Sequence, residues 1–362
     1  MMQSTDKRWK QLGDVLVNYC LEVQPGQKVI IAQSEIETWP LALASYESVI
    51  MAGGYPQIQM KSEYLRRAFM KYGTEEQYSW APEIEVLSME WADCCLTLRG
   101  GYNLDLFHDI PAEILARNQQ AHGVVSTARW KNTRWTLTRV PNEAFARQAG
   151  LDLETVMDMY FDACLLDYAS LLSEWTRWAD KLENTAEVHL TGRNTDLRMS
   201  IKGHTWGKPD ARFNLPGAEM DTSPVVESVN GHIWFENPGV LAGRLMHDMY
   251  LEWENGQLVK AGASSNEDYL QKILATDTGS SKVGEFSIGL NPKLSHFTKD
   301  ILWDEKILGT AHIALGRADP RTNGTNNSLI HWDIVKDLRQ EGEVKVDGVT
   351  ILKDGVLLLD KI

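Results

Sequence analysis

Five acidic and histidine side chains in the second half of this 362-residue chain stand in segments that are otherwise apolar or rich in glycine. They are Glu219, Glu285, His312, His331 and Asp333. Histidine, aspartate and glutamate are the ligands that a borderline divalent metal finds in a domain poor in cysteine. In "SLIHWDI", His331 and Asp333 stand two positions apart, so on an extended chain both side chains point to the same face. This spacing favours a metal site.

Each of these residues also has an ordinary structural role open to it. Glu219 follows the turn-forming pair Pro216 and Gly217, where a glutamate is commonly a solvated loop charge. Glu285 could pair with Lys282 or face water, and His312 in "GTAHIALG" could be a hydrogen-bonded core histidine. The set as a whole favours metal, because two glutamates, two histidines and one aspartate with uncharged neighbours suit two ions and a bridging carboxylate.

Such a centre would perform hydrolysis. Two divalent ions about 3.5 to 4 Å apart polarise a substrate carbonyl and lower the pKa of a shared water. Three carboxylates and two neutral imidazoles offset three of the four positive charges. A single zinc would need only three of these ligands. Glu219 or Glu285 could serve as the general base, and the sequence does not choose between them.

The elements that carry these residues fall into two expected domains, residues 1–185 and 186–362. In the first, buried strands are predicted at "KVIIAQ", "YPQIQM", "ADCCLTLRG" and "AHGVVSTAR", and "WPLALASYESVIMAGG" is predicted as a helix that joins the first two as a βαβ unit. These patterns predict an α/β domain with an open, largely parallel sheet of at least four strands. No glycine-rich phosphate-binding motif follows any of them.

The second domain is expected to be α+β and rich in antiparallel strands, and to carry the metal site. After a long helical stretch at 151–183, short alternating strands dominate, with one helix predicted near 264–276. The dipeptides Asn230-Gly231, Asn255-Gly256 and Asp354-Gly355 predict tight hairpins.

Composition excludes several classes of partner. Thirty-six basic residues against fifty acidic ones give a net charge of −14, which argues against nucleic acid or an anionic membrane. No apolar run is long enough to span a bilayer, and the N-terminus enters a polar helical pattern rather than the apolar core of a signal peptide. We therefore expect a cytoplasmic protein that acts on a small molecule or a short peptide.

The chain resembles the aminopeptidase T and aminopeptidase S family of two-metal exopeptidases over nearly its full length. The likeness lies in "LGDVLVNYCLEVQPGQKVII", "RWTLTRVPNEAFARQAGLDLE" and "GRNTDLRMSI", and most specifically in "NLPGAE", "GEFSIGLN", "AHIALG" and "SLIHWDI". The resemblance implies that Glu219, Glu285, His312, His331 and Asp333 bind zinc, cobalt or manganese, with Glu285 bridging both ions. It also implies a homodimer that encloses the active sites.

Two positions depart from the family's pattern. Ser-Gly usually precedes the first metal glutamate, whereas Gly217 and Ala218 precede it here. The segment after "HIALG" normally carries a tyrosine near the metals, and this chain has Asp319 there. A phenol can donate a hydrogen bond to a developing oxyanion, and an ionised carboxylate cannot. Asp319 could instead receive a substrate amine, add a metal contact or face water.

Three functions fit these features. The first is a metal-dependent aminopeptidase acting on short peptides. The second is a ring-opening iron dioxygenase of a hydroxypyridine-type aromatic, for which His312, His331 and Asp333 could form a facial triad. The third is a two-metal hydrolase of a non-peptide amide. Candidate substrate contacts are Asp319, Arg129, Arg134 and His232.

Overall fold

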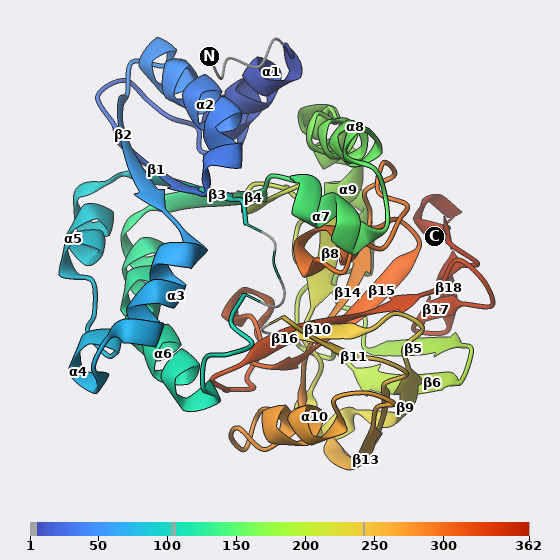
Figure 1. The fold of residues 1–362 in the computed structure, drawn as a ribbon. Coiled ribbons are helices and arrows are strands. Elements are labelled where there is room, and N and C mark those ends of the chain that lie inside the picture. Colours follow the sequence, from blue (N-terminus) through green and yellow to red (C-terminus); the bar gives the residue numbers. More distant parts are fainter. Residues whose placement is uncertain (1–5, 102, 104–105, 242, 362) are drawn as a thin grey trace. The chain divides into compact units, whose positions relative to one another are not determined.

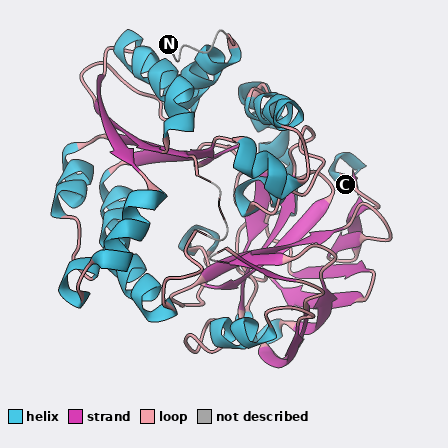
Figure 2. Cartoon of the chain, viewed as in Figure 1, coloured by secondary structure: helices cyan, strands magenta, loops and turns pink. Residues whose placement is uncertain are grey.

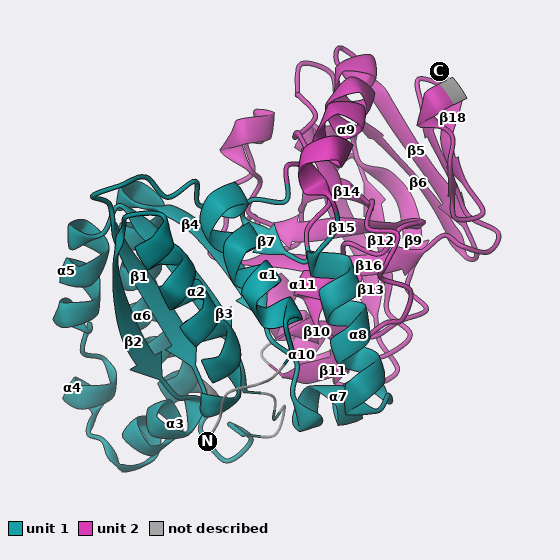
Figure 3. Cartoon of the chain, turned by 90° about the horizontal axis from the view of Figure 1, so that it is seen from above, with its two compact units in different colours: residues 1–166, 211–216 teal, residues 167–210, 217–362 magenta. Residues whose placement is uncertain are grey.

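The structure, a computed structural model, describes residues 6–101, 103, 106–241 and 243–361. Two compact units make up the chain: unit 1 comprises residues 1–166 and 211–216, and unit 2 comprises 167–210 and 217–362 (Figure 3). The division falls before helix α9 (Tyr168–Leu182), earlier than the boundary expected near residue 185. Hydrogen bonds fasten α9 within unit 2, since Trp178 Nε1 donates to Asp360 and Lys181 Nζ donates to the carbonyl of Leu359, each over 3.0 Å.

Unit 1 is built on a five-stranded sheet with the order β2-β1-β3-β4-β7 and all pairs parallel (Figures 1 and 2). The strands are β1 (Lys28–Ser34), β2 (Tyr55–Lys61), β3 (Cys94–Arg99), β4 (Arg134–Arg139) and β7 (Asn214–Leu215). This confirms the predicted parallel α/β sheet.

Helices cover both faces of this sheet (Figure 1). On one face lie α1 (Arg8–Asp14), which continues as a π-helix at Val15–Cys20, and α2 (Trp39–Met51). On the other face lie α3 (Glu63–Tyr72), α4 (Glu75–Tyr78), α5 (Glu83–Trp91) and α6 (Ala112–Asn132). Two further helices of this unit, α7 (Glu143–Ala149) and α8 (Leu153–Cys164), follow β4 in the chain. Ile30, Cys95 and Met89 form part of the core between β1, β3 and α5.

The strand predicted at "AHGVVSTAR" is wrong, because residues 121–129 lie within α6 and the fourth strand is β4. Val125 is 9% exposed and packs in the core, whereas its neighbour Val124 is 43% exposed. A buried parallel strand would hide both valines, whereas a helix turns only one toward the sheet. The helix-favouring residues around "ILARNQQA" outweighed the strand preference of the valine pair.

Unit 2 contains an eight-stranded sheet, a four-stranded sheet and a separate strand pair, all of them antiparallel. The eight-stranded sheet has the order β13 (Gln257–Gly262), β12 (Tyr250–Glu254), β9 (Asn230–Trp234), β6 (Thr195–Ser200), β5 (Glu187–Gly192), β17 (Glu343–Val346), β18 (Val349–Lys353) and β19 (Val356–Leu357). The four-stranded sheet has the order β16 (His331–Asp337), β15 (Thr310–Gly316), β14 (Val283–Gly289) and β8 (Glu219–Thr222). The pair is β10 (Gly239–Leu241) and β11 (Arg244–Met246), and the remaining helices are α10 (Glu267–Leu274) and α11 (Ile301–Asp304).

Two of the three predicted hairpin turns are confirmed. Asn255-Gly256 joins β12 to β13 and Asp354-Gly355 joins β18 to β19, with positive φ at all four residues. Asn230-Gly231 instead opens strand β9, so the hairpin predicted there is wrong. A Cβ on Gly231 would lie 2.1 Å from the carbonyl oxygen of Asp196, so this glycine permits a close approach of β9 to β6.

The four cysteines are buried and free. In the described part of the chain, no helix combines the length and the apolar character needed to cross a membrane.

Candidate metal centre

The four-stranded sheet brings the five predicted residues to one of its faces. In the strand register, Glu285 lies opposite Ala314, and Ala314 lies opposite Asp333. His312 lies opposite Ser287, two residues along β14 from Glu285, so it shares the same face. The partner of Glu219 is Gly289 and that of His331 is Gly316. Small residues between the functional side chains therefore leave room for them to converge.

These side chains form two groups that share Glu285. The first is Glu219, Glu285 and His312, the second is Glu285, His331 and Asp333, and in each group the potential ligand atoms lie within 4.8 Å of one another. His312 Nε2 is 3.3 Å from Glu285 Oε1, and His331 Nε2 is 3.8 Å from Glu285 Oε2. The two oxygens of one carboxylate thus face two different imidazoles, which is the arrangement of a bridging ligand.

Two further distances between imidazole nitrogens and carboxylate oxygens in these groups are similar. His312 Nε2 lies 3.5 Å from Glu219 Oε2, and His331 Nε2 lies 3.2 Å from Asp333 Oδ1. Glu285 and His312 are buried, and the side chain of His331 is 29% exposed. The side chain of Glu219 is 25% exposed, so the centre is partly open at both Glu219 and His331.

Unsatisfied polar atoms in this cluster test whether a metal would fit it. Glu219 Oε2, Asp333 Oδ1 and His312 Nδ1 are buried and make no hydrogen bond with the described residues. A buried acceptor without a partner is costly. A divalent cation would satisfy both carboxylate oxygens, and carboxylates with imidazoles are a suitable donor set for it. The residues present fit a metal.

The electrostatic potential of the cluster is strongly negative. Burial alone would lower the pKa of His312, but a hydrogen bond to Glu285 and the charges of Glu219 and Asp333 raise it to about 9. The charge of Asp333, opposed in part by burial, raises the pKa of His331 to about 11. The field that favours a proton on each imidazole also favours a cation between the carboxylates.

Backbone hydrogen bonds fix the turn that presents Glu219. The N–H of Gly217 donates to Tyr168 Oη on α9 over 3.2 Å, and its carbonyl accepts from Asn291 Nδ2 over 3.1 Å. The carbonyl of Ala218 accepts from the N–H of Leu290 over 3.0 Å.

On the other side of the cluster, a backbone contact orients the ring of His331. His331 Nδ1 lies 2.7 Å from the carbonyl oxygen of Arg317, which leaves Nε2 facing Asp333.

Sequence reasoning missed two residues of the cluster, Glu305 and Lys306. Lys306 Nζ pairs with Glu219 Oε1 and lies 2.7 Å from Glu305 Oε1. Glu305 also forms a third potential ligand group with His312 and Asp333. Burial raises the pKa of Glu305 to about 8, although Lys306 opposes the shift. In "LWDEKILG" Glu305 stands between Asp304 and Lys306, so it lacks the uncharged neighbours that identified the other five.

Asp221 was also missed, although it stands two residues after Glu219 on β8 and so on the same face. Burial, with the charges of Glu285 and Glu219 next in size, raises the pKa of Asp221 to about 8. Burial and the neighbouring carboxylates therefore favour the protonated form of the Asp221 carboxyl.

The four candidate substrate contacts lie outside the two groups. Arg129 on α6 lies over the ring of Trp135, and Arg134 on β4 donates to the carbonyl of Leu21, both within unit 1. His232 on β9 stacks on Tyr250 in the eight-stranded sheet. Asp319 accepts hydrogen bonds from the N–H of Arg321 over 2.7 Å and from its Nε over 2.8 Å.

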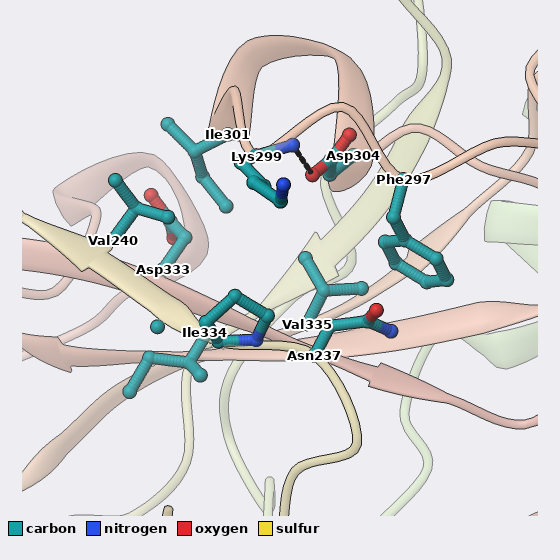
Figure 4. A pocket seen from close by; sticks show the side chains of 11 residues that line it. Asn237, Val240, Phe297, Lys299, Ile301, Asp304, Asp333, Ile334 and Val335 are labelled. Atoms are coloured by element: carbon teal, nitrogen blue, oxygen red, sulfur yellow. Dashed lines mark hydrogen bonds between the residues drawn. The ribbon is translucent and has the colours of Figure 1, made fainter. Parts of the chain in front are cut away.

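A small pocket adjoins the cluster, because Asp333 belongs to both (Figure 4). Its lining residues come from β10 and the segment before it, from α11 and the loop before it, and from β16. They are Asn237, Pro238, Gly239, Val240, Phe297, Lys299, Ile301, Asp304, Asp333, Ile334 and Val335. Its lining therefore combines apolar side chains with polar groups from Asn237, Lys299 and the two aspartates.

A parallel α/β unit and an antiparallel unit that carries clustered carboxylates and imidazoles are the features of a metal-dependent enzyme. Residues 5–357 match the family described as thermophilic metalloprotease (M29), and the chain belongs to that family. The predicted resemblance to the aminopeptidase T and S family is thereby confirmed.

Individual relatives carry aminopeptidase names. The chain is 24% identical to aminopeptidase 2 of Geobacillus stearothermophilus, covering 98% of this chain and 96% of that protein. It is 28% identical to aminopeptidase T of Thermus aquaticus, covering 68% and 70%.

Solved structures share the fold. Wild-type AmpT from Thermus thermophilus superposes with a TM-score of 0.87 at 22% identity, covering 98% of this chain and 100% of that one. A 2,5-dihydroxypyridine dioxygenase from Pseudomonas putida KT2440 gives a TM-score of 0.62 at 12% identity, covering 97% and 96%. At these identities the likeness establishes the fold alone.

Proposed function

We propose that this protein is a metal-dependent aminopeptidase that releases N-terminal residues from short peptides. The observation that carries the proposal is the pair of ligand groups that share Glu285 and leave buried carboxylate oxygens unsatisfied. Membership of the thermophilic metalloprotease family and the aminopeptidase names of its relatives support the same activity.

The metal ligands in this proposal are Glu219, Glu285, His312, His331 and Asp333. Up to two ions of zinc, cobalt or manganese would be held, with Glu285 between them. When bound, such ions polarise the scissile carbonyl and lower the pKa of water.

The chain's own residues supply proton transfer. A carboxylate accepts a proton from the attacking water and returns it to the leaving amine. Both oxygens of Glu285 face imidazoles, and Glu219 has Oε1 paired with Lys306 and Oε2 3.5 Å from His312 Nε2. Glu219 and Glu285 are therefore both candidates for the proton-transfer role.

The surroundings of the cluster support recognition of a peptide N-terminus. The acidic field attracts the ammonium group of a peptide. We place the side chain of the first residue beside Asp333, against Val240, Phe297 and Ile301, which favour an apolar side chain.

The test is a comparison of leucyl and arginyl amides with acetylated leucyl amide, after loading the metal-free protein with zinc, cobalt or manganese. We expect cleavage of the free-amine substrates, a preference for leucyl, and none of the acetylated one. An inert wild type with an active Asp319→Tyr variant would instead indicate a two-metal hydrolase of a non-peptide amide. Absence of hydrolysis by both proteins with every metal would refute the proposal.

A second candidate is the ring-opening iron dioxygenase. His312 Nε2 lies 3.9 Å from Asp333 Oδ1 and His331 Nε2 lies 3.2 Å from it, so two imidazoles and a carboxylate converge as a facial triad requires. Anaerobic metal analysis separates the two candidates. One iron per chain with oxygen consumption on a hydroxypyridine supports the dioxygenase, and zinc or cobalt with peptide cleavage supports the aminopeptidase.

We also propose that the protein acts as a homodimer, as its resemblance to the aminopeptidase T and S family implies. Light scattering coupled to size-exclusion chromatography measures the mass directly. A value near the 40.9 kDa of one chain would contradict this proposal.

A further inference from the structure

Lys306 places a buried ammonium group among the carboxylates of the candidate centre. Its side chain is 2% exposed, and its Nζ pairs with Glu219 Oε1 and with Glu305 Oε1. Glu219 belongs to the group with His312 and not to the group with His331. The fixed positive charge therefore lies against one of the two potential metal positions.

The main chain around Lys306 is held against strand β14. The N–H of Asn291 donates to the carbonyl of Lys306 over 2.8 Å, and the N–H of Leu308 donates back to Asn291 over 3.1 Å. A Cβ on Gly289 would lie 2.2 Å from the carbonyl oxygen of Ile307, and Gly289 is the register partner of Glu219. The ammonium therefore cannot leave Glu219 through a shift of its own backbone without breaking this packing.

The other metal position has no equivalent cation. Among the described residues, the charged partners of Asp333 and Glu285 within ion-pair distance are the imidazoles of His312 and His331. Both imidazoles are themselves potential ligands. No lysine or arginine in the described part of the chain lies within ion-pair distance of these two carboxylates, so none competes directly with a metal ion there.

We propose, on the basis of the proposed function, that Lys306 acts as a built-in cation that makes the two metal positions unequal. The position of Glu285, His331 and Asp333 binds its ion tightly. The position of Glu219, Glu285 and His312 binds its ion at least roughly tenfold more weakly. One oxygen of Glu219 is already paired with the ammonium of Lys306, and this ammonium repels a metal ion bound beside it.

The rival interpretation is that Glu305 neutralises Lys306, so that the lysine only orients Glu219 and both positions bind equally. Removing both charges together distinguishes the two interpretations. In the double variant Lys306→Met/Glu305→Gln the ammonium beside Glu219 is removed together with the carboxyl that pairs with it. Replacing a buried pair by neutral residues of similar size also avoids leaving one charge unpaired.

The experiment is a titration of the metal-free full-length protein with Co²⁺, followed by calorimetry and by the visible absorption of bound cobalt. For the wild type we expect one tight ion per chain and a second at least about tenfold weaker. In the double variant we expect the second ion to tighten by about tenfold or more. Metal analysis after dialysis should find about one ion in the wild type and about two in the variant.

The chain offers a matched control in its other buried lysine. Lys336 Nζ pairs with Glu236 Oε1 at 2.5 Å and donates to the carbonyls of Arg193 and Trp234. Lys336 stands three positions from Asp333 on β16 and so on the opposite face of the strand. Lys336→Met/Glu236→Gln should leave both cobalt affinities unchanged.

Equal affinity for two ions in the wild type would overturn the inference, whether or not the variants fold. An unchanged second affinity in a folded Lys306→Met/Glu305→Gln variant would overturn it as well. Failure of the proposed function would give a different result. Unequal cobalt binding without peptide cleavage would refute the aminopeptidase proposal but would still support the role of Lys306.

Discussion

Ala218 is a residue whose conformation suits glycine better than alanine. Its φ is 92°, a value that L side chains rarely adopt, and it immediately precedes Glu219. We expect Ala218→Gly to raise the free energy of unfolding by about 1 kcal/mol, because relief of backbone strain outweighs the loss of one buried methyl group. Urea denaturation followed by circular dichroism measures the change.

A second alanine provides the control for this substitution. Ala311 lies inside strand β15, where glycine brings only added chain entropy and a lost methyl contact. Ala311→Gly should therefore lower the unfolding free energy. If Ala218→Gly lowered it as much, the strain assigned to Ala218 would be wrong.

Among the elements, strand β15 controls the space between the ligands. Ala314 stands in register between Glu285 and Asp333 and is fully buried. Ala314→Val would push added methyl groups into the space that these carboxylates share, so we expect metal affinity to fall by at least about tenfold and stability by about 1 to 3 kcal/mol. Calorimetric titration with zinc measures the affinity.

The matched substitution is Ala311→Val on the same strand. Ala311 is equally buried, but it lies in register between Ile288 and Lys336 on the opposite face. Overpacking there should cost similar stability and leave zinc affinity intact. Equal losses of affinity in both variants would show that β15 does not act through the space beside the ligands.

Helix α9 influences the centre through a single hydroxyl group. Tyr168→Phe removes the acceptor of the buried N–H of Gly217, which we expect to cost about 1 to 3 kcal/mol and to weaken metal binding by loosening the turn before Glu219. Tyr160→Phe is the control, since its hydroxyl bonds Thr138 at 2.7 Å within unit 1. It should reduce stability without changing metal affinity, and a similar loss of affinity in both variants would contradict the proposed path.

Sequence patterns predicted elements well where local periodicity decides the structure. The apolar runs of β1 and β3 and the Asn255-Gly256 hairpin follow from strand and turn chemistry alone. Asn230-Gly231 carries the same turn signal, but the carbonyl of Asp196 on a neighbouring strand decides its conformation. The partners of Lys306 are likewise set by strand pairing between distant segments, so no local pattern specified its ion pair with Glu219.

At the scale of the whole molecule, metal binding should stabilise unit 2 more than unit 1. All the candidate ligands lie in unit 2, on β8, β14, β15 and β16. A ligand that binds only the folded state stabilises it by about 4 kcal/mol when present at a thousand times its dissociation constant. The stabilisation is expected first in the strands that carry the ligands, because local opening there releases the ion.

Hydrogen exchange measured by mass spectrometry tests this expectation. Zinc should slow amide exchange in peptides from β8, β14, β15 and β16, and chelation should reverse the effect, while peptides from β1 to β4 of unit 1 exchange at the same rate throughout. The variant His331→Ala, which removes one ligand from the group with Glu285 and Asp333, should lose most of the protection. Slowing of equal size in β1 to β4, or protection that persists in His331→Ala, would mean that zinc acts somewhere other than the face of the four-stranded sheet.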